Sequence, residues 1–122
     1  MIQKCKDALK VLVHDDFDAV QDGNKVTLTN TVYTPAKVVD TATVTKDKNA
    51  YILDADFFFP ADLAPYYKAF CILFGNEQKE MYRVKRVKNT KKEKVDIFID
   101  TDHEYRMTYG MKHSGIILEV IK

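Results

Sequence analysis

The chain has 122 residues and a formal net charge of +1, with 46% hydrophobic and 30% charged residues. These values are typical of one soluble globular domain, and seven Phe and seven Tyr exclude a chain that stays disordered. The longest apolar runs are far shorter than the ~20 residues of a membrane span, and no signal peptide pattern follows Met1. Cys5 and Cys71 fit neither a redox motif nor a zinc spacing. We therefore expect buried free thiols, a reducing cytoplasmic location and no membrane partner.

An amphipathic helix is predicted over residues 2–20. Apolar side chains recur at steps of three and four residues from Ile2 to Val13, with lysines on the other face. The following segment, His14–Asp18, places three Asp at the C-terminal end of this helix, where the macrodipole disfavours negative charge. This conflict favours an earlier end of the helix, near His14, over a functional role for the carboxylates.

The hydrophobic period changes from helical to two-residue alternation after this helix. Three strands separated by turns are predicted over residues 25–32, 38–45 and 50–59. In the third of these strands, five apolar side chains share one face, and Asp54 and Asp56 share the other. This alternation indicates a half-buried strand.

A second helix is predicted over residues 62–74, with Asp62 as its N-cap and a broad aromatic face. Four further strands follow, at residues 80–88, 94–100, 104–111 and 115–121. Short turns join these strands without room for a crossover helix, which predicts an antiparallel meander. The sequence therefore predicts a single α+β domain over residues 1–122. Two amphipathic helices pack on a largely antiparallel β-sheet system in the order α-β-β-β-α-β-β-β-β, and one sheet or two sheets both fit.

The segment from Lys79 to Lys94 is the strongest functional signal in the sequence. It holds eight basic side chains against two acidic ones, a local charge of +6 in a chain of +1. Its strand carries cations on both faces and cannot be buried on both, because an unpaired buried charge costs several kcal/mol. We therefore expect an edge strand or a long protruding hairpin.

A basic surface of this kind is a candidate contact for phosphates or carboxylates. We predict a non-catalytic binding or assembly protein whose partner is a polyanion such as nucleic acid, or an acidic protein surface. The predicted contact residues are Tyr82, Arg83, Lys85, Arg86, Lys88, Lys91, Lys92 and Lys94. The cations would neutralise charge, and Tyr82 would stack on a base or pack against the partner.

The basic segment is also consistent with a purely structural role. Lysines on an edge strand prevent edge-to-edge aggregation, and the acidic remainder of the chain could pair with them. An alternative function is a β-rich structural subunit that self-associates into a homo-oligomer through its sheet edges.

A weaker alternative is a metal-dependent hydrolase that uses four carboxylates, those of Asp54, Asp56, Asp100 and Asp102. Carboxylate oxygens are ligands for Mg²⁺ and Mn²⁺ and serve in phosphoryl chemistry. However, Asp100–Glu104 falls in a predicted tight turn, where Asp is frequent for backbone reasons. A solvated acidic surface is therefore the favoured interpretation, without a metal.

Catalytic signatures do not support an enzyme. Ser114 is the only serine and stands beside His113 without a GxSxG elbow, and no P-loop is present. We therefore predict no catalytic residues and no cofactor. The aromatic residues between 57 and 74 are expected in the core, except that Phe58 falls on the same strand face as the two Asp. On a solvated face, Phe58 would be an exposed anchor for a protein–protein contact, together with Tyr66 or Tyr67.

Overall fold

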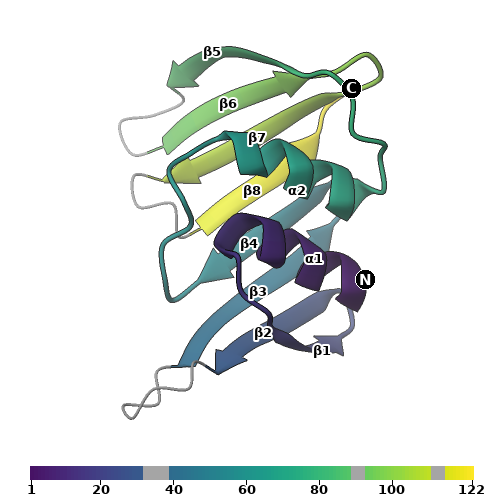
Figure 1. Cartoon of the computed structure of the whole chain (residues 1–122). Coiled ribbons are helices and arrows are strands. Elements are labelled where there is room, and N and C mark those ends of the chain that lie inside the picture. The colour runs from purple at the N-terminus through teal and green to yellow at the C-terminus, as the bar shows by residue number, and fades with distance from the viewer. Residues whose placement is uncertain (32–38, 89–92, 111–114) are drawn as a thin grey trace.

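The computed structural model describes residues 1–31, 39–88, 93–110 and 115–122, which form two helices and eight strands (Figure 1). In chain order the elements are α1 (Ile2–Val13), β1 (Asp18–Asp22), β2 (Lys25–Thr31), β3 (Val39–Asp47), β4 (Ala50–Ala55), α2 (Ala64–Phe74), β5 (Tyr82–Lys88), β6 (Glu93–Ile99), β7 (Glu104–Gly110) and β8 (Gly115–Val120). The predicted α+β class with an antiparallel sheet is confirmed, with one more strand than the sequence predicts.

Helix α1 ends at Val13, so the predicted extension to residue 20 is wrong. His14 has a left-handed backbone (φ 61°) and donates its N–H to the carbonyl of Lys10, which closes the last helical turn. The acidic residues that follow therefore lie outside the helix, as the macrodipole argument predicts. Asp18–Asp22 forms β1, a strand that the sequence analysis had assigned to the helix.

Two-residue hairpin loops connect β1 to β2 and β3 to β4. Gly23, with φ 62°, begins the two-residue loop in which Asp22 and Lys25 face each other across β1 and β2. A positive φ at the first loop residue gives the turn the twist of the flanking strands. Lys48, with φ 52°, has the same position between β3 and β4.

Helix α2 follows β4 after a short connection. Its N-cap is Leu63 rather than Asp62, although Oδ1 of Asp62 accepts the N–H of Ala64 at 3.3 Å. Gly75 ends the helix with a left-handed backbone (φ 70°), the conformation that glycine adopts most readily. Within the described part of the chain, neither helix has the length and apolar character needed to cross a bilayer.

A pairing between β4 and β8 joins the two meanders into one sheet. Leu53 on β4 faces Ile116 on β8, and both side chains are fully buried. The complete strand order is β1-β2-β3-β4-β8-β7-β6-β5, and every neighbouring pair is antiparallel. Strands β1 and β5 are therefore the two edges, and they run in opposite directions.

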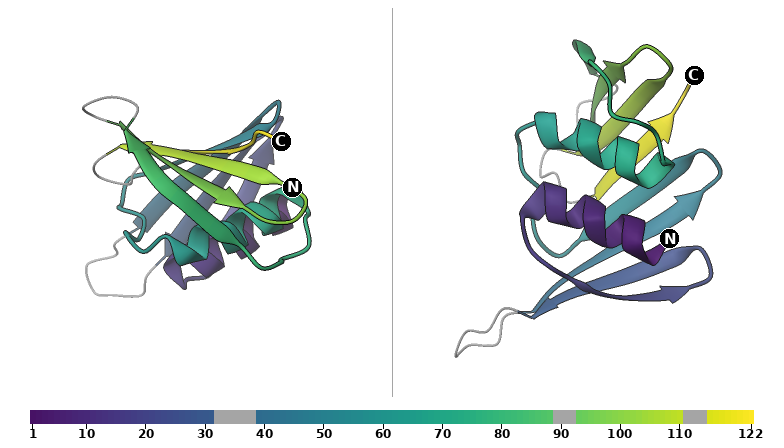
Figure 2. Two further views of the ribbon diagram at one scale, coloured as in Figure 1. Left: turned by 90° about the horizontal axis from the view of Figure 1, so that it is seen from above. Right: turned by 45° about the vertical axis from the view of Figure 1, so that its right-hand side comes forward.

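Both helices lie side by side on one face of the sheet (Figure 2). Phe70 of α2 contacts Phe98 of β6 and Tyr105 of β7, with ring centroids 5.7 and 5.0 Å apart. Cys5 on α1 and Cys71 on α2 belong to the same cluster of buried residues and are free thiols. Burial raises the pKa of the Cys5 thiol to about 11 and also raises that of Cys71.

Candidate functional site

The basic segment forms one edge of the sheet. Strand β5 pairs with β6 on one side and has no strand on its other side among the described residues (Figure 1). The expected edge position is therefore confirmed, and about half of the backbone groups of β5 point away from the sheet. We call residues 82–94, which comprise β5, the start of β6 and the segment between them in the sequence, the basic ribbon.

The first residues of the basic ribbon are exposed. Tyr82 is 66% exposed, and the Arg83 side chain is exposed as well. Within the described residues, neither Arg83 nor Lys94 forms an ion pair or a side-chain hydrogen bond. Lys94 is half-buried and faces Tyr109 of β7 in register. The acidic remainder of the chain thus leaves these two cations unmatched.

The backbone register places the other cations of the ribbon. Val84 pairs with Ile97 and Val87 with Val95, so two consecutive residues, Lys85 and Arg86, occupy one place in the ladder. Such a bulge bends an edge strand and increases its twist. The side chains of Lys85, Arg86 and Lys88 and the whole of Lys91 and Lys92 lie outside the described residues.

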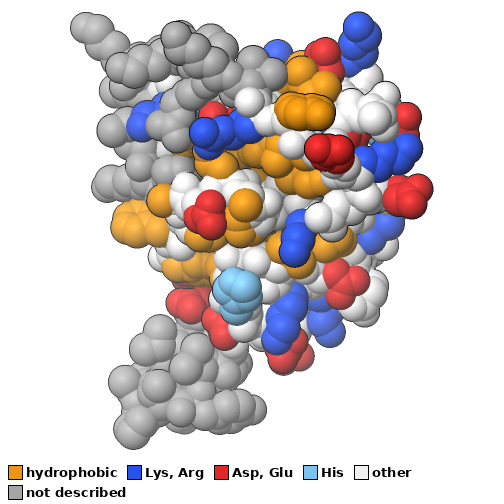
Figure 3. Space-filling view, turned by 45° about the horizontal axis from the view of Figure 1, so that its top comes forward, with side chains coloured by type: hydrophobic (Ala, Val, Ile, Leu, Met, Phe, Trp, Pro, Cys, Tyr) orange, Lys and Arg blue, Asp and Glu red, His pale blue; other side chains and the backbone are white. Residues whose placement is uncertain are grey.

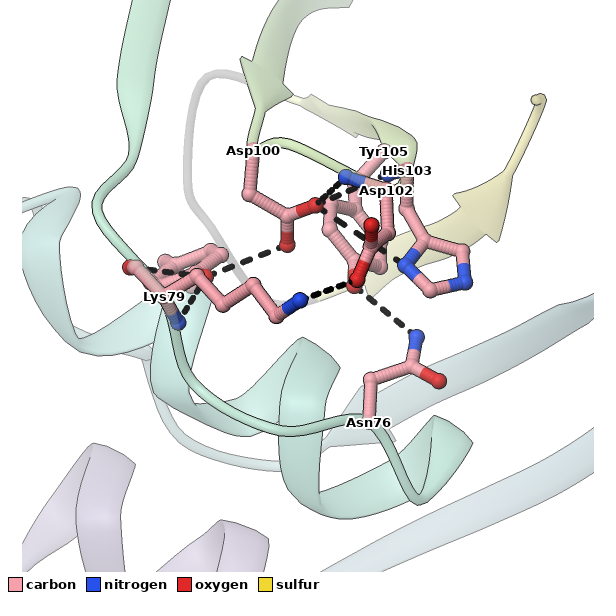
Figure 4. A network of polar contacts seen from close by, with 7 residues as sticks. Asn76, Lys79, Asp100, Asp102, His103 and Tyr105 are labelled. Atoms are coloured by element: carbon pink, nitrogen blue, oxygen red, sulfur yellow. Dashed lines mark hydrogen bonds and ion pairs between the residues drawn. The ribbon is translucent and has the colours of Figure 1, made fainter.

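Lys79 is not part of this free surface. Its Nζ donates to a carboxylate oxygen of Asp102 in the turn between β6 and β7 (Figure 4). This hydrogen bond and the charge of Asp102 raise the pKa of Lys79. Lys79 and Asp102 are 23 positions apart in the sequence, and no local pattern indicates that they pair.

A network around Asp100 holds the connection between α2 and β5 in place (Figure 4). The Tyr67 hydroxyl accepts the N–H of Lys79 at 2.8 Å and lies 2.9 Å from the Lys79 carbonyl oxygen and 3.1 Å from Oδ2 of Asp100. Its single proton serves one of those two acceptors at a time. On the other side, Asn76 donates to the Tyr105 hydroxyl at 2.8 Å. These contacts determine where the chain enters β5.

Asp100 is buried in this network, contrary to the predicted solvated acidic surface. Its Oδ1 accepts the backbone N–H groups of Asp102 and His103, both at 2.8 Å. Burial alone would raise the pKa of Asp100, but these bonds and the Tyr67 hydroxyl outweigh it and lower that pKa below its ordinary value. The predicted tight turn is therefore confirmed, with Asp100 as the residue that organises it. Burial raises the pKa of Tyr67 to about 12.

The four carboxylates of the metal-binding alternative do not meet. Asp54 and Asp56 are exposed near the C-terminal end of β4, whereas Asp100 and Asp102 follow the C-terminal end of β6. Strands β4 and β6 run in opposite directions, so these pairs lie at opposite ends of the sheet. In the part of the chain that the structure describes, no three His, Cys, Asp or Glu side chains are grouped so as to hold a metal ion.

The aromatic anchor predicted at residue 58 is exposed, but without its predicted companions. Phe58 is 66% exposed, while Tyr66 and Tyr67 are buried. The Tyr66 hydroxyl donates to the carbonyl of Pro60 at 2.6 Å, which ties it to the connection before α2. A patch that combines Phe58 with either Tyr66 or Tyr67 is therefore excluded.

The structure has a second charged edge that was not predicted from the sequence. Strand β1 forms the other edge of the sheet, and its Asp18 and Asp22 are exposed without an ion pair among the described residues. Between them, Val20 is 71% exposed. The Gly23-Asn24 pair is the signal that would have revealed this strand, because such a pair marks a two-residue turn between alternating strands.

Charges of both signs are mixed on one face of the molecule. Over the face drawn in Figure 3, the described Lys and Arg side chains are interspersed with Asp and Glu. Opposite charges are thus segregated to the two sheet edges, basic on β5 and acidic on β1. No protein family, no curated protein and no solved structure matches this chain.

Proposed function

We propose that this protein is a non-catalytic binding protein that contacts an anionic partner through the basic ribbon. The observation that carries the proposal is the edge position of β5, with Arg83 exposed and unmatched by any described carboxylate. Several cations that lie together on an open edge produce a positive potential, which attracts the phosphates or carboxylates of a partner.

The chemistry of the ribbon favours sequence-independent contacts. Its polar side chains are mostly those of Lys and Arg, and they stand beside one exposed aromatic ring, Tyr82. Cations contact phosphate oxygens and fix the position of a nucleic acid, while base identity is recognised through amide and bidentate contacts in the grooves. Tyr82 suits stacking on an unpaired base, which tolerates any sequence. We therefore propose nucleic acid, or an acidic protein surface, as the partner class.

Retention on heparin and binding to a fluorescein-labelled single-stranded oligonucleotide test this proposal. Each phosphate contact contributes a slope of about −0.7 to the logarithm of the binding constant against the logarithm of salt concentration. The triple variant Arg83→Glu, Arg86→Glu, Lys88→Glu should lose at least tenfold in affinity and elute from heparin at much lower salt.

The matched control reverses the same number of charges elsewhere. Lys4, Lys68 and Lys122 are exposed and lie outside the ribbon. The variant Lys4→Glu, Lys68→Glu, Lys122→Glu has the same net charge as the ribbon variant and should keep most of the affinity. Equal losses in both variants, or no retention of the unmodified protein at low salt, would contradict a role for the ribbon.

We also propose a cytoplasmic location. Cys5 and Cys71 are free and buried in the described structure. Reduced thiols persist in a reducing compartment, which supports this assignment.

A further inference from the structure

The two edges of the sheet carry opposite charges. Strand β1 has the sequence DAVQD and exposes Asp18 and Asp22, and β5 has the sequence YRVKRVK with four cations. Each edge also presents backbone N–H and C=O groups that have no strand partner among the described residues. A chain that carries one acidic and one basic open edge holds both halves of a complementary contact.

The strand directions permit antiparallel pairing across this contact. The sheet has eight antiparallel strands, so β1 and β5 of one molecule run in opposite directions. A second copy placed so that it continues the twisted sheet therefore brings its β5 antiparallel to β1 of its neighbour. The helices of both copies then lie on the same face, and the antiparallel pattern of the sheet continues across the contact.

Charge also selects this contact among the ways in which edges can meet. A contact between two β5 edges opposes cations to cations, and a contact between two β1 edges opposes carboxylates to carboxylates. The pairing of β1 with β5 is the one that places carboxylates opposite cations.

We infer that the basic ribbon binds the acidic β1 edge of a second copy of this chain, so that copies associate head to tail. This inference rests on the proposed function and names the partner of the same site. Each contact uses two different surfaces and leaves one β1 and one β5 edge open, so assembly continues past a dimer until a ring closes or a filament grows.

Sedimentation velocity over a concentration series at low salt tests the assembly. The average mass should exceed 14.1 kDa, rise with concentration, and return to 14.1 kDa as salt screens the edges. A protein that stays at 14.1 kDa at the highest concentration and lowest salt would overturn the inference.

Charge reversal at each edge identifies the surfaces. The variant Asp18→Lys, Asp22→Lys should lower the association constant at least tenfold, and so should Arg83→Glu, Arg86→Glu, Lys88→Glu. An equimolar mixture of the two variants should associate again, because each then offers the other a complementary edge. The control Asp47→Lys, Asp54→Lys changes two exposed carboxylates outside β1 and should associate like the unmodified protein. If both variants remain monomeric in the mixture, the inference is wrong.

Heparin retention separates this inference from the proposed function. The Asp18→Lys, Asp22→Lys variant keeps its ribbon and should be retained on heparin at least as strongly as the unmodified protein while it fails to self-associate. If the unmodified protein is retained on heparin but remains a monomer, the proposed function is still supported and the second copy is rejected as its partner. Should the lysine variant not fold by circular dichroism, Asp18→Asn, Asp22→Asn removes the same charges with smaller side chains and is tested in its place.

Discussion

The carboxylate of Asp100 shows how one buried residue positions the start of the basic ribbon. It accepts two backbone N–H groups in its own turn and lies 3.1 Å from the Tyr67 hydroxyl of α2. Tyr67 in turn contacts both backbone groups of Lys79, shortly before β5 begins. The turn, the helix and the ribbon are therefore linked through a single carboxylate.

The variant Asp100→Asn should lower the free energy of unfolding by about 1–3 kcal/mol at pH 7, because hydrogen bonds to an ionised acceptor are lost. The pKa of Asp100 is lower in the folded protein than in the unfolded chain, where it is about 3.9. Its stabilisation is thus fully present above that value and disappears as pH falls through the folded pKa. Urea unfolding at pH 7, 5 and 3 should show the difference between variant and unmodified protein shrinking at the lowest pH.

A control for this experiment is Asp102→Asn. Asp102 is exposed and bonds to Lys79 through solvent-accessible side chains. Asp102→Asn should therefore lower the free energy of unfolding by no more than about 1 kcal/mol. A pH-independent effect of Asp100→Asn would show that the shape of the residue, and not its charge, stabilises the turn.

The contacts of individual residues were the least accessible to sequence analysis. The tight turn at Asp100 was predictable, since Asp commonly accepts N–H groups two and three residues ahead. Its burial was not, because the Tyr67 hydroxyl comes from a helix 33 residues away. The pairing of Lys79 with Asp102 was hidden for the same reason, and it removes one cation from the predicted basic surface.

At the scale of the elements, the end of α1 offers a direct test of the fold. His14 has a φ of 61°, a conformation that a side chain makes unfavourable and glycine tolerates. His14→Gly should therefore raise the free energy of unfolding by about 0.5–1 kcal/mol in thermal or urea denaturation.

The neighbouring substitution Asp15→Gly serves as the comparison. Among the described residues other than glycine, only His14 and Lys48 have positive φ, so Asp15 gains nothing from the added freedom. A stabilisation of equal size in Asp15→Gly would contradict the strain argument at His14.

Most elements were predictable because their periodicity is strong. The alternation over residues 104–111 and 115–121 predicts β7 and β8 to within one residue at each end. Strand β1 was missed because Phe17 and Val20 continue the three- and four-residue steps of α1, and a five-residue strand is too short to outweigh them. The acidic edge was missed with it, since Asp18 was assigned to the helix and Asp22 to the segment that ends it.

At the scale of the whole molecule, the pairing of β4 with β8 decides whether the two meanders unfold together. Leu53 and Ile116 meet at this seam and are fully buried. Leu53→Ala should lower the free energy of unfolding by about 2–5 kcal/mol, the usual effect of truncating a buried leucine. Hydrogen exchange should then accelerate equally in β2 and β6, because one cooperative unit loses stability as a whole.

Ala19→Gly at the edge of the sheet provides the contrast. Ala19 is half-buried on β1, so removal of its methyl group should affect local opening of β1 more than global unfolding. Faster exchange in β2 with unchanged protection in β6 in the Leu53→Ala variant would mean that the two meanders are separate units.

The joining of the meanders could not be predicted from the sequence. Hairpin loops indicate which consecutive strands pair, and apart from the β1–β2 pair they correctly predict the antiparallel neighbours within each half. The β4–β8 pairing spans about half of the chain and leaves no local signal, so one sheet and two sheets remained equivalent. The segregation of charge to opposite edges follows from this pairing, because only a single sheet places β1 and β5 at its two ends.

The reactivity of the two buried thiols reports on how often the core of the protein opens. Cys5 and Cys71 lie on the two helices, and their raised pKa values keep them protonated and unreactive at neutral pH. An alkylating reagent added to the native protein must wait until a helix leaves the sheet, whereas both sulfurs react at once in urea. The ratio of these labelling rates measures how often the core is exposed, without any engineered probe.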